Sequence, residues 1–225
     1  MYDLTFILPL YGENFFTTSL MMFSSLLRIR TSKSINVLVF YDETTPIESI
    51  DYIEQLIEQC KSKNISFEFI FSENTHSGYK RNKGIEKASE NSKYIWLIDQ
   101  DDWLLIEEID KLILLADELI EKEKRPLVRI DFQRQTLVGA KTNIDEVLSM
   151  PWQYIIDAKI AAKYKFDETV EMNSDVPFIF GIIEGENITE LMKTNDAMYY
   201  YNYLSPDSES YKWFVTDKKT SALQS

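Results

Sequence analysis

The chain has 225 residues with 24 basic and 37 acidic side chains, which gives a formal net charge of −13 at pH 7. Such a charge argues against general DNA or RNA binding, because that function needs a positively charged surface. Hydrophobic residues make up 44% of the chain, enough for the core of one large domain, so disorder of the whole chain is not expected.

The single cysteine and the distribution of apolar residues predict the compartment. One cysteine, Cys60, excludes an internal disulfide and favours a reducing environment. Residues 1–10 are apolar but have no basic n-region and no cleavage site, so they are interpreted as a strand and not as a signal peptide. No apolar run approaches about 18 residues, so no transmembrane segment is expected. We therefore predict a cytoplasmic protein.

Apolar strands and amphipathic helices alternate up to residue 132. Short apolar runs predict strands at residues 5–10, 35–41, 66–71, 94–98 and 127–132. Helical spacing of apolar residues, or a polar helical composition, predicts helices at residues 15–30, 47–60, 79–92 and 106–120. This alternation predicts an α/β fold with a mostly parallel central sheet and helices on both faces.

The alternation weakens beyond residue 135. Pro151 suits the start of a helix predicted over residues 151–165, and a second helix is predicted over residues 173–184. The aromatic segment 198–203 has strand propensity, and residues 206–225 are mostly polar.

Three carboxylates stand where a buried strand is expected to meet solvent. Asp99, Asp101 and Asp102 directly follow the apolar run 94–98. Such a cluster repels itself unless a cation or a donor-rich ligand neutralises it. Mg²⁺ and Mn²⁺ take oxygen ligands and often bridge one or two carboxylates to substrate phosphates. The cluster is therefore a candidate metal–phosphate site, and a solvated acidic turn is the alternative.

The order of the elements predicts which polar segments come together. In parallel sheets, ligands bind beyond the carboxyl ends of the strands. The polar segments 11–14, 42–45 and 99–102 each follow a predicted strand, so they should gather along one edge of the sheet. With His76 as the only histidine, no metal site or catalytic triad based on several histidines can be assembled.

Several of these segments resemble one known family. Arg81-Asn82-Lys83-Gly84, followed after a helix and an apolar strand by Asp99-Gln100-Asp101-Asp102, resembles the core of family 2 glycosyltransferases, which have the GT-A fold. Pro9-Leu10-Tyr11-Gly12 is similar to the first-strand segment of that family, and Asp42 matches its base-binding acidic position. Phe166-Asp167-Glu168 followed by Ser174-Asp175 resembles its acceptor segment.

The resemblance implies a Rossmann-like, metal-dependent transferase. Such an enzyme moves a sugar from a nucleotide-diphosphate sugar, here a UDP-sugar, to an acceptor hydroxyl. Mn²⁺ or Mg²⁺ stabilises the departing diphosphate as a Lewis acid. By match to the family motif, Asp101 is the expected metal ligand, and Asp99 contacts the ribose or the metal.

The remaining site residues are likewise implied by the resemblance. Pro9, Tyr11 and Glu13 should shape the base pocket, and Asp42 should accept from the uracil N–H. Arg81 should pair with the diphosphate, or hold Asp99 and Asp42 in place.

An inverting transferase also needs a general base for the acceptor hydroxyl, and the match implies Asp175. Other roles are open for two of the acidic residues. Asp42 could cap the helix region that follows it, and Asp175 could be a helix N-terminal charge that interacts with the macrodipole.

The resemblance also divides the chain. It implies a single domain over residues 1–225, with a nucleotide-sugar-binding half at 1–102, an acceptor-side half at 103–210 and a polar tail at 211–225. A hexosyltransferase of polysaccharide biosynthesis is expected, with a glycan, lipid-linked or protein acceptor. The alternatives are a non-catalytic nucleotide- or glycan-binding relative and, less favoured, a nucleotidyltransferase, because residues 11–14 carry one glycine and no cation.

Overall fold

The computed structural model describes residues 1–12, 15–105, 109–122, 124, 126–134, 150–169, 175–188 and 193–201. The strands are β1 (Tyr2–Pro9), β2 (Ile35–Tyr41), β3 (Ile65–Phe71), β4 (Ser92–Leu97), β5 (Trp103–Leu104), β6 (Leu127–Arg134), β7 (Tyr154–Asp157) and β8 (Lys193–Tyr201). Within the described ranges they form one sheet in the order β3-β2-β1-β4-β7-β6-β8-β5.

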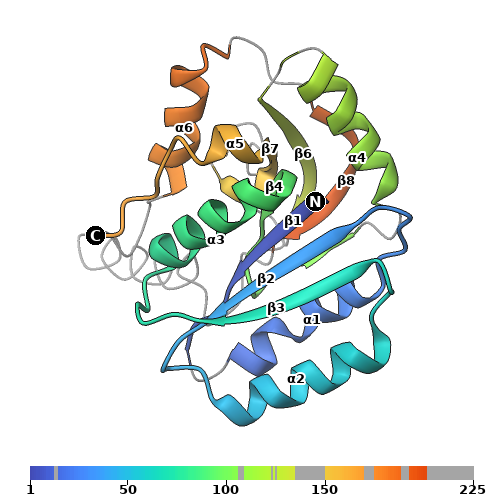
Figure 1. Ribbon diagram of the computed structural model, residues 1–225, viewed down its shortest axis with the longest axis vertical. Helices are drawn as coiled ribbons and strands as arrows, with labels where there is room; N and C mark the ends of the chain where they lie inside the picture. Colours follow the sequence, from blue (N-terminus) through green and yellow to red (C-terminus); the bar gives the residue numbers. More distant parts are fainter. Residues whose placement is uncertain are drawn as a thin grey trace, which may run out of the picture.

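Helices cover both faces of this sheet (Figure 1). They are α1 (Phe15–Leu27), α2 (Ile47–Cys60), α3 (Ser77–Asn91), α4 (Asp110–Ala116, continued by a π-helix at Asp117–Lys122), α5 (Ala158–Ala161) and α6 (Asp175–Gly185). Apolar residues of α1, α2 and α4 join one core cluster, and those of α3, α5 and α6 join the other. In the part of the chain that the structure describes, no helix is long and apolar enough to cross a membrane.

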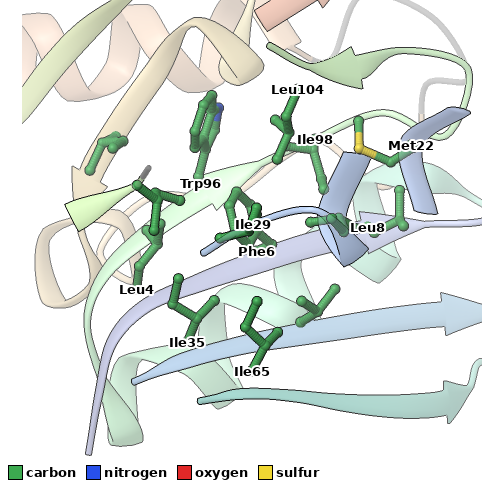
Figure 2. Close-up of a cluster of buried hydrophobic side chains, with 14 of the residues drawn as sticks. Leu4, Phe6, Leu8, Met22, Ile29, Ile35, Ile65, Trp96, Ile98 and Leu104 are labelled. Atoms are coloured by element: carbon green, nitrogen blue, oxygen red, sulfur yellow. The ribbon is translucent and has the colours of Figure 1, made fainter. Parts of the chain in front are cut away.

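The central strand β1 is buried on both faces, which explains its continuous apolar sequence. Leu4, Phe6 and Leu8 belong to the core cluster that includes α1, and Figure 2 shows them together with Met22 of that helix. Ile7, one position out of phase, belongs to the cluster on the α3 face. The strand β1 pairs in parallel with β2 and β4, and β2 pairs in parallel with β3. The predicted α/β sheet is confirmed.

The helix predicted over residues 151–165 is wrong in its central part. Residues Tyr154–Asp157 form β7, which runs antiparallel between β4 and β6. Tyr154, Ile155 and Ile156 are aromatic or β-branched and fully buried, so they suit a central strand better than a helix. Within the predicted range, Pro151–Gln153 form a 3₁₀-helix and only α5 is α-helical. The Asp157 carboxylate caps α5 by accepting from the N–H groups of residues 159 and 160 at 2.9 and 3.0 Å.

Other boundaries differ by smaller amounts. The two-residue strand β5, which no pattern predicted, pairs with β8 at the sheet edge. The helix predicted over 173–184 corresponds to α6, and the strand predicted over 198–203 corresponds to the end of β8. Residues 202–225, which include the predicted polar tail, lie outside the described residues, as does Glu13.

Gly84 lets α3 pack closely on β1. A Cβ atom at Gly84 would lie 2.5 Å from Cγ2 of the fully buried Ile7. We expect Gly84→Ala to lower the free energy of unfolding by about 1–3 kcal/mol, the usual cost of overpacking. At Gly181 of α6 the added Cβ would meet Tyr164 at an ordinary 3.5 Å, so Gly181→Ala should stabilise by about 0.4–1 kcal/mol. Urea denaturation of both variants checks this, and equal changes would contradict it.

Candidate active site

The loops after β1, β2 and β4 meet at the carboxyl edge of the sheet, as predicted. The Tyr11 N–H donates to Gln100 Oε1 at 2.9 Å, and Gln100 Nε2 donates back to the Tyr11 carbonyl at 3.1 Å. The Gly12 N–H donates to Thr44 Oγ1 at 3.1 Å. Gly12 has a φ of 79°, a left-handed conformation that favours glycine. These bonds connect the three loops into one surface, called below the strand-end edge.

Arg81 of α3 connects two carboxylates that lie far apart in the sequence. Its Nη2 donates to Asp99 Oδ1 at 2.5 Å, and its Nη1 forms an ion pair with Asp175 Oδ1. Asp99 follows β4, whereas Asp175 is the first residue of α6. The structure thus places the predicted general base beside the acidic cluster. The Asp99 and Asp175 side chains are 19% and 21% exposed, so a ligand can approach them.

The protonation of these groups reflects burial and mutual attraction. Burial raises the pKa of Asp175; Arg81 opposes this rise, and the nearby Asp99 adds to it. Burial disfavours the Arg81 cation, but Asp175 and Asp99 together raise the pKa of Arg81 above its ordinary value. Arg81 therefore stays charged, while Asp175 holds its proton to higher pH than an ordinary aspartate.

The neighbouring residue Lys80 forms a second, fully buried ion pair with Asp42. The Lys80 ammonium contacts Asp42 Oδ2 and also donates to the Leu10 carbonyl at 2.6 Å. The other oxygen, Asp42 Oδ1, accepts from the N–H and hydroxyl of Thr44 at 2.8 and 2.5 Å. The Asp42 side chain is 1% exposed. Both of its oxygens are therefore engaged within the chain, and base recognition by Asp42 stays a prediction.

Lys80, and not Arg81 as one interpretation of the sequence suggested, contacts Asp42. This pairing was not predicted, although the sequence carries a signal for it. Lys80, Gly84 and Ala88 recur every four residues and are all buried in α3. A lysine on the apolar face of a helix needs a partner, since burying an unpaired charge is costly. Burial lowers the pKa of Lys80, and the Asp42 carboxylate opposes that change.

The next residue of α3, Asn82, fixes the segment that precedes α6. Its amide accepts from the Phe166 N–H at 2.8 Å and donates to the Phe166 carbonyl at 3.0 Å and to Glu168 Oε1 at 2.7 Å. The Phe166 ring stacks on Phe178 of α6 with centroids 4.1 Å apart, and the Arg81 guanidinium lies 5.3 Å from its centre. Three consecutive residues of α3 therefore contact three parts of the site. Lys80 pairs with Asp42 after β2, Arg81 pairs with Asp99 and Asp175, and Asn82 holds the segment before α6.

The three aspartates after β4 have different surroundings. Asp102 is fully buried and accepts from the Tyr199 hydroxyl at 2.6 Å. The same hydroxyl accepts from the Asp99 N–H at 3.1 Å. Burial and the Asp102 and Asp99 charges raise the pKa of Tyr199, so this phenol remains a donor. Asp101 is partly exposed at the turn. Asp102 therefore supports the turn, whereas Asp99 and Asp101 remain partly exposed.

Removing the Tyr199 hydroxyl should loosen this turn. Tyr199→Phe keeps the ring stacked on Trp152, whose centroid is 4.8 Å away, but deletes both hydrogen bonds. We expect the free energy of unfolding to fall by about 1–3 kcal/mol, because Asp102 loses a buried donor. Tyr52→Phe, at a tyrosine 56% exposed on α2, should change it by no more than about 0.5 kcal/mol. Equal losses in urea denaturation would contradict this role.

The acidic turn suits a metal ion that is shared with a phosphate ligand. Among the residues described, no group of three or more His, Cys, Asp or Glu side chains could hold a metal ion by itself. Mg²⁺ commonly uses only one or two carboxylates and takes its other ligands from water and substrate phosphates. Asp99 and Asp101 fit that arrangement because both are partly exposed, whereas the buried Asp102 does not.

The other predicted pocket residues lie at the same edge. Pro9 is the buried last residue of β1. Tyr11 lies next to the acidic turn, and burial together with Asp101 and Asp99 raises the pKa of its phenol well above the ordinary value. The parallel half-sheet, the acidic turn after β4 and the arginine from α3 define a protein of the GT-A class.

The family model for glycosyl transferase family 2 matches residues 5–121, more than half of the 225 residues, and the chain belongs to this family. S. aureus TarS 1–349 in complex with UDP-GlcNAc has a similar fold, with a TM-score of 0.69 at 15% identity over 93% of this chain and 60% of TarS 1–349. Its complex with UDP has a TM-score of 0.67 at 17% identity over 90% and 61% of the two chains.

A longer TarS structure has a TM-score of 0.65 at 17% identity, over 91% of this chain and 37% of that chain. The chain therefore spans less than two thirds of each of these TarS structures. A search of curated proteins found no match.

Proposed function

We propose that this chain is a metal-dependent glycosyltransferase that moves a sugar from a UDP-sugar to an acceptor hydroxyl with inversion. One observation carries the proposal: Arg81 holds Asp99, next to the acidic turn, and Asp175, at the start of α6, in a single ion-pair cluster. This arrangement supports a donor-binding role for Asp99 and a proton-acceptor role for Asp175. The TarS complexes with UDP and UDP-GlcNAc support the choice of nucleotide.

The residues would divide the chemistry as follows. Asp99 and Asp101 would hold Mn²⁺ or Mg²⁺, which as a Lewis acid would stabilise the departing diphosphate. Tyr11 and Pro9 would border the nucleotide base. Asp175 would accept the proton of the acceptor hydroxyl, and Arg81 would fix the position of Asp175 relative to the donor.

The wider context follows from the family resemblance. We propose one domain with a nucleotide-sugar half at residues 1–102 and an acceptor half at 103–210. We also propose a hexosyltransferase that works in the cytoplasm in polysaccharide biosynthesis, on a glycan, lipid-linked or protein acceptor.

Calorimetry with UDP, UDP-GlcNAc and Mn²⁺ tests the proposal. We expect both nucleotides to bind in the presence of Mn²⁺, and slow donor hydrolysis to depend on the metal. Asp101→Asn should abolish that hydrolysis, whereas Glu58→Gln on the exposed side of α2 should leave it unchanged. If the chain binds neither nucleotide, the proposed function is wrong; unchanged hydrolysis in Asp101→Asn would remove Asp101 from the metal site.

The pH dependence of donor hydrolysis tests Asp175. Its pKa is raised above the ordinary value of 3.8, and only the ionised carboxylate can accept a proton. The rate should therefore rise with pH through a limb centred above 3.8 and be lost as the pH falls through it. Asp175→Asn should slow the reaction by about 10²–10⁴-fold and remove that limb. A variant that keeps the limb would show that another group is the base.

A non-catalytic nucleotide-binding relative is the second candidate. The ion pair of Asp175 with Arg81 favours it, because one carboxylate oxygen is already engaged within the chain and is not available to an acceptor hydroxyl. Binding of UDP without hydrolysis or transfer to any of a broad set of acceptors would support this function.

A further inference from the structure

Trp103, the residue directly after the acidic turn, stacks on a second aromatic side chain, Tyr200. Trp103 of β5 and Tyr200 of β8 are partners in the antiparallel register, with ring centroids 3.9 Å apart and planes inclined by 10°. Both side chains are only partly buried. The strand β5 is the last in the sheet order, so this aromatic pair lies at the sheet edge.

The aromatic pair is connected to the ion-pair cluster through the acidic turn. Side chains alternate between the two faces along a strand. Leu104 and Tyr199, the neighbouring partners in the register, belong to the core cluster that includes α1 and α4. Trp103 and Tyr200 are out of phase with these two residues and do not belong to that cluster. The connection to the ion-pair cluster runs through the acidic turn, because Trp103 directly follows Asp102, and Asp99 of the same turn pairs with Arg81.

The position of the aromatic pair relative to the acidic turn indicates what it could bind. Trp103 is two residues from Asp101, the proposed metal ligand, and one residue from the buried Asp102. A ring at this place is adjacent to where the proposed function puts the reacting sugars. Aromatic side chains at ligand sites offer a flat apolar surface with a partly negative face. A pyranose ring offers a matching apolar face of C–H groups.

We propose that Trp103, supported by Tyr200, is a stacking surface for a pyranose ring of the substrate. The proposal rests on the proposed function and extends it to a sugar-binding site. The stacked sugar could belong to the donor or to the acceptor, and both present the same C–H face. A purely structural cross-strand pair would affect stability but would not distinguish sugars from nucleotides.

The test uses Trp103→Leu, which keeps an apolar side chain in β5 but removes the flat ring, and Tyr200→Leu as a second variant. Tyr52→Leu on α2 is the control, since that tyrosine is exposed and belongs neither to the acidic turn nor to the ion-pair cluster. For each protein, calorimetry gives the affinities for UDP and UDP-GlcNAc. Saturation-transfer NMR with methyl β-glucopyranoside and methyl N-acetyl-β-glucosaminide, in the presence of UDP and Mn²⁺, measures contact with a free sugar.

If the ring holds the donor sugar, Trp103→Leu should weaken UDP-GlcNAc binding by roughly 2- to 10-fold without changing UDP binding. If it holds an acceptor sugar, the NMR contact of the free glycoside should disappear while the ratio of the two affinities stays constant. Tyr200→Leu should act in the same direction and more weakly. Tyr52→Leu should match the unmodified protein in every measurement.

The stacking surface would be rejected if both variants remain folded by circular dichroism and change neither the UDP-GlcNAc affinity nor the free-sugar contact. A protein in which UDP itself does not bind, with or without these substitutions, would instead reject the proposed function. The two failures are therefore distinguishable.

Discussion

Arg81→Met is expected to lower the free energy of unfolding by about 2–4 kcal/mol and to remove measurable donor hydrolysis. The substitution leaves two like charges, Asp99 and Asp175, facing each other without their shared cation. Breaking a buried pair usually costs about 3–5 kcal/mol. The expected loss is smaller here because each carboxylate is about a fifth exposed, and water can partly compensate it.

The activity should fall further than stability alone explains. Without Arg81 the two carboxylates repel each other, so the proposed base moves away from the donor, and misplacement by about 1 Å can cost a factor of about 10². Arg81→Lys should recover part of the stability but little of the rate, because one ammonium cannot reproduce the fork that contacts both partners. Urea denaturation and metal-dependent hydrolysis of UDP-GlcNAc measure the two effects.

Lys83→Met is the matched control on the same helix. Lys83 is 51% exposed, pairs with the exposed Glu86 and lies 5.9 Å from the centre of the Tyr79 ring, so its loss should leave both stability and hydrolysis nearly unchanged. Similar losses in the Arg81 and Lys83 variants would show that the charge of α3, and not the bridge between carboxylates, matters.

Lys80→Met should destabilise the protein by about 3–5 kcal/mol, the larger of the two stability losses. The substitution leaves Asp42, which is 1% exposed, without a cation in the interior. It also removes the donor to the Leu10 carbonyl, which connects the loop after β1 to α3. Nucleotide binding should weaken as well, because Leu10 and Asp42 lie in the loops after β1 and β2, which are part of the strand-end edge.

The double variant Lys80→Met with Asp42→Asn separates the charge effect from packing. Since the asparagine amide is neutral, the double variant should recover at least half of the stability lost in Lys80→Met. With Asp42→Asn as the second single variant, the interaction energy from the double-mutant cycle should be at least about 1.5 kcal/mol, because it equals the recovered stability plus the loss in Asp42→Asn alone. Additive losses in urea denaturation would mean that the two side chains do not act as a pair.

The sequence predicted the parallel half of the fold because strands and helices there obey local periodicity. The continuous apolar runs that became β1, β2 and β4 are buried on both faces by helices, whereas the edge strand β3 is only partly buried. The prediction of a helix at β7 was wrong because packing between distant strands, and not local periodicity, decides the conformation there. Residues 151–165 carry helix-compatible spacing, but burial between β4 and β6 decided the conformation of Tyr154–Asp157.

In the candidate site, too, the sequence predicted some features and only the structure showed others. Asp99, Asp101, Arg81 and Asp175 could be named from residue types, spacing and family resemblance. The contact of Arg81 with Asp99 was one of the expectations, but its ion pair with Asp175, 94 residues away, and the contact of Lys80 with Asp42 were not. The same holds for Tyr199, which reaches Asp102 from a strand 97 residues away.

By itself, the sequence determined that this protein has an α/β sheet with an acidic turn at one strand end, because hydrophobic periodicity and strand order act over short distances. Only the tertiary structure decided that Lys80 forms an ion pair with Asp42, that Arg81 joins Asp99 to Asp175, and that Asp102 is buried. Those choices depend on which strands become neighbours in the sheet and on the need of every buried charge for a partner.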